Sequence, residues 1–228
     1  MFWSRTKERP LFIGLNKEEE PNVPFSIWEI RVKEIVSVDV DDDGLSFDSK
    51  SIQVETITET ADYQGIRIRF IGTLDSARIN MQIDVGFGDV IFPSSEILSL
   101  PAILDFPAPK LLCYSKESVI AEKFEAMLKL GELNSRMKDF YDIYLLSHNY
   151  EFDMKQLAEA IRRTLEKRET SIPEKIMAFS PDFVEDKQSQ WIAFLNRIND
   201  THTPTEFSEI ISSLRDFLNP IIAALTST

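Results

Sequence analysis

The densest group of chemically capable side chains lies in the segment "NSRMKDFYDIYLL", residues 134–146. At about 100° per residue, a helix over this segment places Lys138, Asp139 and Asp142 on one arc, with Arg136 beside Asp139. The rest of the helix surface is apolar, so we expect it to be largely buried, where charges are costly unless they are paired. Two ion pairs, Lys138–Asp142 and Arg136–Asp139, satisfy this requirement on spacing alone.

A second charged position lies just upstream, in "VIAEKFEAM", residues 119–127. Glu122 and Lys123 interrupt an otherwise apolar helical pattern there. Periodicity alone favours Lys123 as a surface lysine whose aliphatic stem covers apolar neighbours while its ammonium reaches water.

A third position is a carboxylate at the end of a predicted strand. The segment "SARINMQIDVGFGD", residues 76–89, alternates apolar and polar residues as a half-buried strand does, and it ends on Asp84 before two glycines and Asp89. Asp84 is either a solvent-facing residue above a turn or a side chain held there because something binds. The alternating segment 65–74 predicts a hairpin partner that brings Arg67 and Arg69 near Asp84.

Together these residue types suit the binding of phosphate and metal ions. Carboxylates hold Mg²⁺ through hard oxygen ligands, while lysine and arginine bind nucleotide phosphates. A competing metal motif, "DVDDDG" at Asp39–Gly44, matches the first half of a calcium loop, but its twelfth position is Lys50 instead of glutamate. We therefore interpret it as an acidic turn between strands.

The elements that position these residues change character in the middle of the chain. Residues 1–106 read as strands and turns, including 51–57 and 65–74, and residues 107–228 read as helices, which predicts an α+β protein of two domains. The predicted helices span 115–131, 135–149, 153–168, 181–198 and 203–218. The last has Thr203 as its N-cap, followed by Pro204 and Glu206 in a capping box.

Composition limits the classes of function. A net charge of −13 opposes broad nucleic-acid binding, although residues 110–138 hold six basic against four acidic residues. The chain has no membrane-length apolar segment, and its single cysteine, Cys113, is expected to be a buried apolar residue of a cytoplasmic protein. His148 and His202 are expected to be ordinary surface residues.

Three segments, "QIDVGFGD" (82–89), "IAEKF" (120–124) and "SRMKDFYD" (135–142), closely resemble motifs of the nucleotidyltransferase AbiEii/AbiGii toxin family. The resemblance extends from about Lys33 to about Phe152. It implies a DNA-polymerase-β-like nucleotidyltransferase core with a helical extension, a nucleoside triphosphate substrate, Mg²⁺ and an RNA acceptor, which is tRNA for some members. It also implies a toxin of a toxin–antitoxin or abortive-infection system, with an antitoxin partner.

The resemblance assigns a role to each motif residue. It makes Asp84 the metal-binding third carboxylate of the catalytic sheet, Lys123 the residue near the triphosphate and Asp139 the catalytic acid of the last motif. The remaining residues bind nucleotide (Arg136 and Lys138) or support the site (Asp89, Glu122 and Asp142).

One family motif is missing or degenerate. A glycine-rich turn and an Asp-x-Asp strand should precede Lys33, but no glycine precedes Gly14, and Pro10 cannot replace the second carboxylate if Glu8 replaces the first. Two hypotheses follow: an active toxin that transfers nucleotides to RNA, or an N-terminally truncated, inactive relative that binds a partner. An incomplete sheet would leave an open edge, which predicts self-association.

Overall fold

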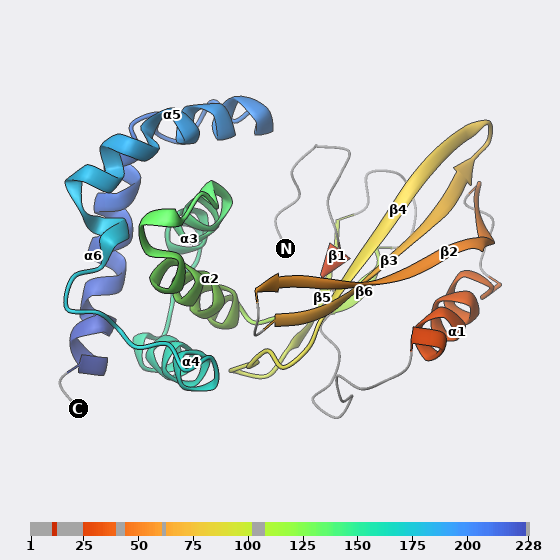
Figure 1. Cartoon of the computed structure of the whole chain (residues 1–228), viewed down its shortest axis with the longest axis horizontal. Helices are drawn as coiled ribbons and strands as arrows, with labels where there is room; N and C mark the ends of the chain where they lie inside the picture. The colour runs from red at the N-terminus through yellow and green to blue at the C-terminus, as the bar shows by residue number, and fades with distance from the viewer. Residues whose placement is uncertain (1–10, 13–24, 40–43, 61–62, 102–107, 227–228) are drawn as a thin grey trace. The chain divides into compact units, whose positions relative to one another are not determined.

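The computed structural model describes residues 11–12, 25–39, 44–60, 63–101 and 108–226 (Figure 1). They belong to two compact units, the first ending at Asp89 and the second beginning at Val90. The sequence-based boundary was 106/107. The packing changes earlier because the backbone N–H and C=O of Phe92 hydrogen-bond to the hydroxyl of Ser118, which ties this segment to the helices.

The N-terminal unit is a four-stranded sheet with one helix. The strand order is β1-β4-β3-β2, with β2, β3 and β4 antiparallel and β1 parallel to β4. The predicted hairpin is therefore confirmed. The elements are β1 (Leu11–Phe12), α1 (Phe25–Val36), β2 (Leu45–Thr60), β3 (Tyr63–Leu74) and β4 (Ala77–Gly86).

The core of this unit lies between α1 and one face of the sheet. Alternate residues of β3, Ile66, Ile68 and Phe70, are buried against Trp28 and Val32 of α1. Period-two alternation leaves the intervening polar residues of β3, Arg67 and Arg69, on the other face.

The C-terminal unit is a bundle of helices preceded by a two-stranded antiparallel sheet (Figure 1). This confirms the α+β prediction. Its elements are β5 (Glu96–Ser99), β6 (Lys110–Cys113), α2 (Lys116–Leu130), α3 (Met137–Asn149), α4 (Met154–Lys167), α5 (Pro181–Ile198) and α6 (Phe207–Thr226), with short 3₁₀ helices η1 (Gly131–Leu133) and η2 (Met177–Phe179).

Local sequence signals set several helix ends. Ser115 and Ser180 accept hydrogen bonds from backbone N–H groups of Ser118 and Phe183 and cap α2 and α5, each cap contributing about 1 kcal/mol. Gly131, with φ at 50°, ends α2 in a conformation that favours glycine.

The predicted start of the last helix is wrong. Thr203 does not cap it; its hydroxyl donates to Asp200 at 2.7 Å, and α6 begins at Phe207. The N–H of Phe207 is instead bound by the side chain of Gln188, on α5, at 2.8 Å. A partner from another helix thus replaces the local capping box.

Buried aromatic rings hold the helices together. Phe124, Phe140, Trp191 and Phe207 are fully buried. The rings of Phe140 and Phe207 meet edge to face, with centroids 5.3 Å apart and planes at 77°, a geometry that adds about 1 kcal/mol to area burial. This core fixes α3 and α5, which carry several site residues.

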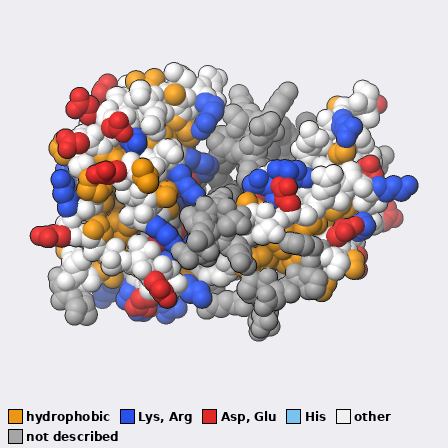
Figure 2. Space-filling model, viewed as in Figure 1, with side chains coloured by type: hydrophobic (Ala, Val, Ile, Leu, Met, Phe, Trp, Pro, Cys, Tyr) orange, Lys and Arg blue, Asp and Glu red, His pale blue; other side chains and the backbone are white. Residues whose placement is uncertain are grey.

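Other sequence-based expectations have mixed outcomes. Cys113 is a buried free cysteine, as predicted. No helix in the described ranges has the length and apolar character needed to cross a membrane. Most of the segment Asp39–Gly44, together with Glu8 and Pro10, lies outside the described residues. Acidic and basic side chains are interspersed on the visible face of both units (Figure 2).

Candidate functional site

Asp84 lies on β4 directly opposite Arg67 on β3. Arg67 donates to both carboxylate oxygens, Nε to Oδ1 at 2.8 Å and Nη2 to Oδ2 at 2.9 Å, and Gln82 adds a bond to Oδ2 at 3.2 Å. Asp84 is thus a buried, bidentate partner of Arg67. The predicted proximity of Arg67 is confirmed, whereas Arg69 pairs with Glu55 at 2.9 Å.

These surroundings do not fit a magnesium centre. Within the described part of the chain, no three His, Cys, Asp or Glu side chains cluster so as to hold a metal. Strand β1 pairs with β4 here, with Phe12 in register with Asp84. Magnesium sites in enzymes combine carboxylates with water and phosphate oxygens, and a guanidinium on both oxygens competes with a cation.

A lysine–aspartate cluster joins α2 and α3 in the C-terminal unit. Lys123 Nζ contacts Asp139 Oδ1 at 2.8 Å and Asp142 Oδ2 at 2.9 Å, and Lys138 also binds Asp142 Oδ2. The side chain of Lys123 is only 17% exposed. Asp139 and Asp142 lie one turn apart on α3, so one face of this helix presents both carboxylates to α2. We call these four residues the lysine–aspartate cluster.

The cluster corrects one prediction and confirms another. Lys123 is not a surface lysine, because it is held by carboxylates on the next helix, α3. The periodicity of α2 alone could not reveal these partners. The Lys138–Asp142 pair is confirmed, and the Arg136–Asp139 pair stays a prediction.

Mutual attraction keeps the cluster charged. Burial by itself lowers the pKa of Lys123, but the negative charges of Asp139 and Asp142 outweigh it and raise that pKa above 10.5. Burial likewise favours the neutral form of Asp142, but Lys123 and Lys138 hold the pKa of its carboxyl below 3.8. The opposite charges therefore keep Lys123 and Asp142 ionised at neutral pH.

The other predicted site residues have different positions. Glu122 is half-buried on α2 beside Lys123, and Arg136 is exposed just before α3. The turn before α3 is held by buried Asn134, whose Oδ1 accepts the N–H of Arg136 at 2.9 Å. Asp84 and Asp89 belong to the N-terminal unit, so their meeting with the lysine–aspartate cluster stays a prediction.

Sequence reasoning missed a hollow beside the cluster. It has a volume of about 460 Å³ and lies between the start of α3 and the second half of α5. We call it the α3–α5 hollow; its polar lining comes from Ser135, Arg136, Lys138, Asp139, Gln190 and Arg197. The two α5 residues carried no motif that could have identified them.

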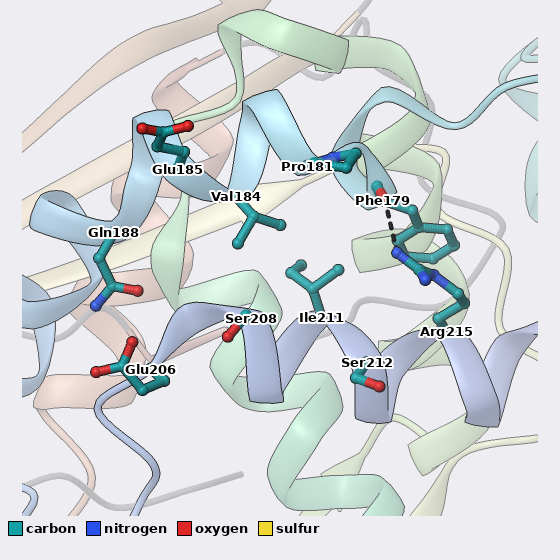
Figure 3. A pocket seen from close by; sticks show the side chains of 10 residues that line it. All are labelled: Phe179, Pro181, Val184, Glu185, Gln188, Glu206, Ser208, Ile211, Ser212 and Arg215. Carbon is teal, nitrogen blue, oxygen red and sulfur yellow. Dashed lines mark hydrogen bonds between the residues drawn. The ribbon is translucent and has the colours of Figure 1, made fainter.

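A second hollow, of about 560 Å³, lies between α5 and α6 (Figure 3). Its charged residues are Glu185, Glu206 and Arg215, and Arg215 donates to the backbone oxygen of Phe179 at 2.7 Å. None of the three family-like motifs (82–89, 120–124 and 135–142) contributes to this α5–α6 hollow.

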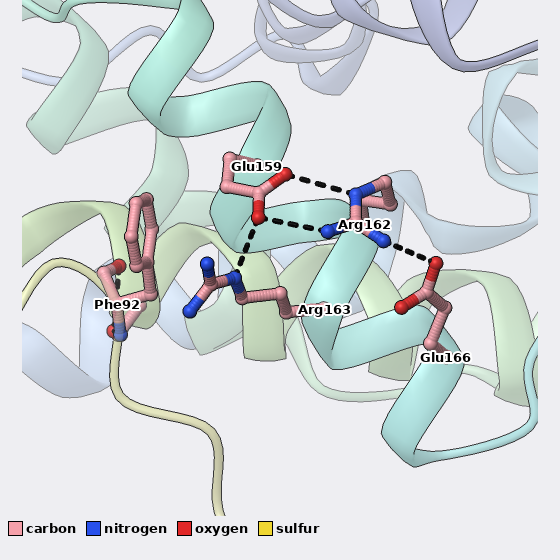
Figure 4. A network of polar contacts seen from close by, with 6 residues as sticks. Phe92, Glu159, Arg162, Arg163 and Glu166 are labelled. Carbon is pink, nitrogen blue, oxygen red and sulfur yellow. Dashed lines mark hydrogen bonds and ion pairs between the residues drawn. The ribbon is translucent and has the colours of Figure 1, made fainter.

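A third polar group lies on α4 (Figure 4). Arg162 and Arg163 bind Glu159, with Arg162 Nη2 and Arg163 Nε 2.8 and 2.6 Å from the same carboxylate oxygen, and these bonds lower the pKa of Glu159 to about 2. The guanidinium of Arg163 also lies 4.2 Å from the ring centroid of Phe92. This exposed network needs no ligand to explain it.

The fold and its charged clusters define a mixed α+β protein, with a sheet unit followed by a helical unit. Residues 29–218 match the family model for the nucleotidyl transferase AbiEii toxin of type IV toxin–antitoxin systems, and the chain belongs to this family. A toxin of this family implies an antitoxin as partner. The resemblance based on three motifs is thereby confirmed.

Two solved structures from Helicobacter pylori have limited similarity to the chain. One is of a proposed nucleotidyltransferase, with 14% identity and a TM-score of 0.40 over 82% of this chain and 70% of that one. The other is of JHP933, with 11% identity and a TM-score of 0.39 over 82% and 72%. No curated protein matches the chain.

Proposed function

We propose that this chain is a nucleotidyltransferase toxin that transfers a nucleotide from a nucleoside triphosphate to an RNA acceptor. In the transfer, a hydroxyl oxygen of the RNA bonds to the α-phosphorus while the bond from that phosphorus to the bridging oxygen breaks. Pyrophosphate leaves, and the hydroxyl proton passes to solvent. The observation that carries the proposal is the family match, which includes the two motifs that form the lysine–aspartate cluster.

Lys123 is the residue we assign to the triphosphate. An ammonium has three N–H donors, and contacts with Asp139 and Asp142 use two of them. The third can donate to a phosphate oxygen without breaking either contact. In this role Asp139 and Asp142 are positioning residues: they hold the lysine charged and fix its direction. Arg136 and Lys138 are exposed beside them and add positive charge for the phosphates.

Nucleotidyltransferases typically use a divalent metal, which neutralises charge on the triphosphate and activates the attacking oxygen. Because Arg67 holds both oxygens of Asp84, no step of the proposed transfer is assigned to a metal at that residue. Mg²⁺ is a requirement of the proposed reaction.

The same ion pair supports a second candidate function. With Arg67 on both oxygens of Asp84, the pair of strands β3 and β4 is suited to a structural role. In this alternative the chain has lost catalysis and acts only by binding a partner protein.

Label transfer distinguishes the two functions. The purified chain is incubated with α-labelled triphosphates, Mg²⁺ and total RNA, alongside Lys123→Ala. The exposed lysine altered in Lys155→Ala is the matched control. Label on RNA from the wild type and the control, and its loss from Lys123→Ala, supports transfer. Absence of label in every sample supports the inactive alternative.

A further inference from the structure

The α3–α5 hollow combines positive side chains from two helices that are far apart in the sequence. Arg136 and Lys138 lie at the start of α3, and Arg197 lies in the last turn of α5. The one acid in its lining is Asp139, whose carboxylate already binds Lys123, and Lys138 is paired with Asp142, so Arg136 and Arg197 supply the excess charge. The lining therefore carries an excess of positive charge, in a chain whose net charge is −13.

Arg197 is the residue of this hollow that no sequence motif assigns. Its guanidinium lies 5.6 Å from the ring centroid of Phe194, and that ring is 4% exposed. Packing on a buried ring restrains the arginine, so less side-chain entropy is lost when it binds a ligand. Among the residues that the structure describes, no carboxylate forms an ion pair with Arg197.

The α5–α6 hollow shows that this charge balance is not a general feature of the bundle. It too has an arginine over an aromatic ring, since Arg215 lies 5.8 Å from the ring centroid of Phe179. However, its lining also contains Glu185 and Glu206, so acids outnumber the arginine. An anion is therefore favoured in the α3–α5 hollow and disfavoured in the α5–α6 hollow.

We propose that the α3–α5 hollow binds the phosphodiester backbone of the RNA acceptor, with Arg197 as a phosphate ligand. The inference rests on the proposed function, because it names where the acceptor of that transfer is held. Asp139 borders both the hollow and Lys123, so RNA in the hollow lies next to the residue assigned to the triphosphate. Gln190 and Ser135 add neutral donors, and arginine binds phosphate oxygens in bidentate geometry.

Binding of a labelled single-stranded RNA oligonucleotide, measured by fluorescence anisotropy, tests the site. We expect Arg197→Ala to weaken binding about tenfold, the cost of one charge-assisted hydrogen-bonded contact. The negative slope of the logarithm of the association constant against the logarithm of salt concentration should become shallower by about 0.7, the value for one phosphate contact on a single strand. Arg197→Lys should retain the slope. Arg215→Ala, which removes the matched arginine, should bind RNA like the wild type.

The outcomes separate this inference from the proposed function. RNA binding that Arg197→Ala leaves unchanged, or that Arg215→Ala weakens equally, overturns the inference even if the wild type transfers label. Weaker binding of free triphosphate with unchanged RNA binding also overturns it, because the hollow would then hold the nucleotide donor. If Arg197 controls RNA binding but no label is transferred, the RNA site stands and the proposed transfer fails.

Discussion

Replacing Lys123 by methionine tests the lysine–aspartate cluster most sharply. Methionine has a similar length but no charge, so the substitution leaves the carboxylates of Asp139 and Asp142 facing α2 without the ammonium between them. Their side chains are 13% and 7% exposed, so water compensates poorly for the loss. Lys138 continues to bind Asp142.

We expect this substitution to lower the free energy of unfolding of the C-terminal unit by about 3 kcal/mol. Removing one partner of a buried ion pair costs about 3–5 kcal/mol, and the remaining Lys138 and partial exposure favour the lower end. The loss should be constant across neutral pH. It should shrink below about pH 4, because the charged state of Asp142 stabilises the fold only above its lowered pKa.

At high pH the stability depends on the charge of Lys123 itself. Its pKa in the folded chain is raised above 10.5, so its stabilising effect is complete below that pH and is lost as the pH rises through the raised value. The difference between wild type and Lys123→Met should therefore also shrink in strong alkali.

Urea unfolding followed by tryptophan fluorescence measures this loss. The chain has three tryptophans, and replacing Trp3 and Trp28 by phenylalanine leaves Trp191, in the core of the C-terminal unit, as the reporter. Lys155→Met, at an exposed position of α4, is the matched control and should change stability by no more than about 0.5 kcal/mol. Equal effects of Lys123→Met and Lys155→Met would refute the reasoning.

Three further predictions concern other polar contacts. Arg67→Met leaves the buried carboxylate of Asp84 without the guanidinium of Arg67, and should lower the free energy of unfolding of the N-terminal unit by about 2–3 kcal/mol. Trp28 fluorescence monitors this unfolding, and an unchanged free energy of unfolding would contradict the bidentate pair. Burial by itself raises the pKa of Asp200, but hydrogen bonds from Thr203 and His202 outweigh it and lower that pKa to about 2. The wild type should therefore lose stability as the pH falls from about 4 to 2, and Asp200→Asn should not show this loss. Acid unfolding curves that coincide for the two proteins would contradict this prediction. Ser180→Ala should lower the free energy of unfolding in urea by about 1 kcal/mol, and Ser180→Gly should lower it by less. An unchanged free energy of unfolding in Ser180→Ala would contradict a stabilising cap.

Local sequence patterns were sufficient to predict a contact or a helix end where the interacting residues lie near one another along the chain. The alternation of β3 and β4 predicted that Arg67 would lie near Asp84, because residues on one face of a hairpin follow from its register. The helix predicted over 181–198 likewise coincides with α5, which Ser180 caps.

Local sequence patterns gave wrong predictions where a residue on another element supplies the contact. Lys123 looked like a surface lysine because its carboxylate partners are on the next helix. Thr203 looked like a cap because the competing acceptor, Asp200, and the replacement cap, Gln188, lie outside the capping-box motif. Arg197 joins the start of α3 only through the packing of the bundle.

Extension of a defined RNA tests the central claim most directly. An end-labelled RNA is incubated with each of the four unlabelled triphosphates and Mg²⁺, and the products are separated at single-nucleotide resolution. We predict a longer product with at least one triphosphate for the wild type and Lys155→Met, and none for Lys123→Met. RNA of unchanged length under all conditions, or equal extension by Lys123→Met, would contradict the assignment of nucleotide transfer to this cluster.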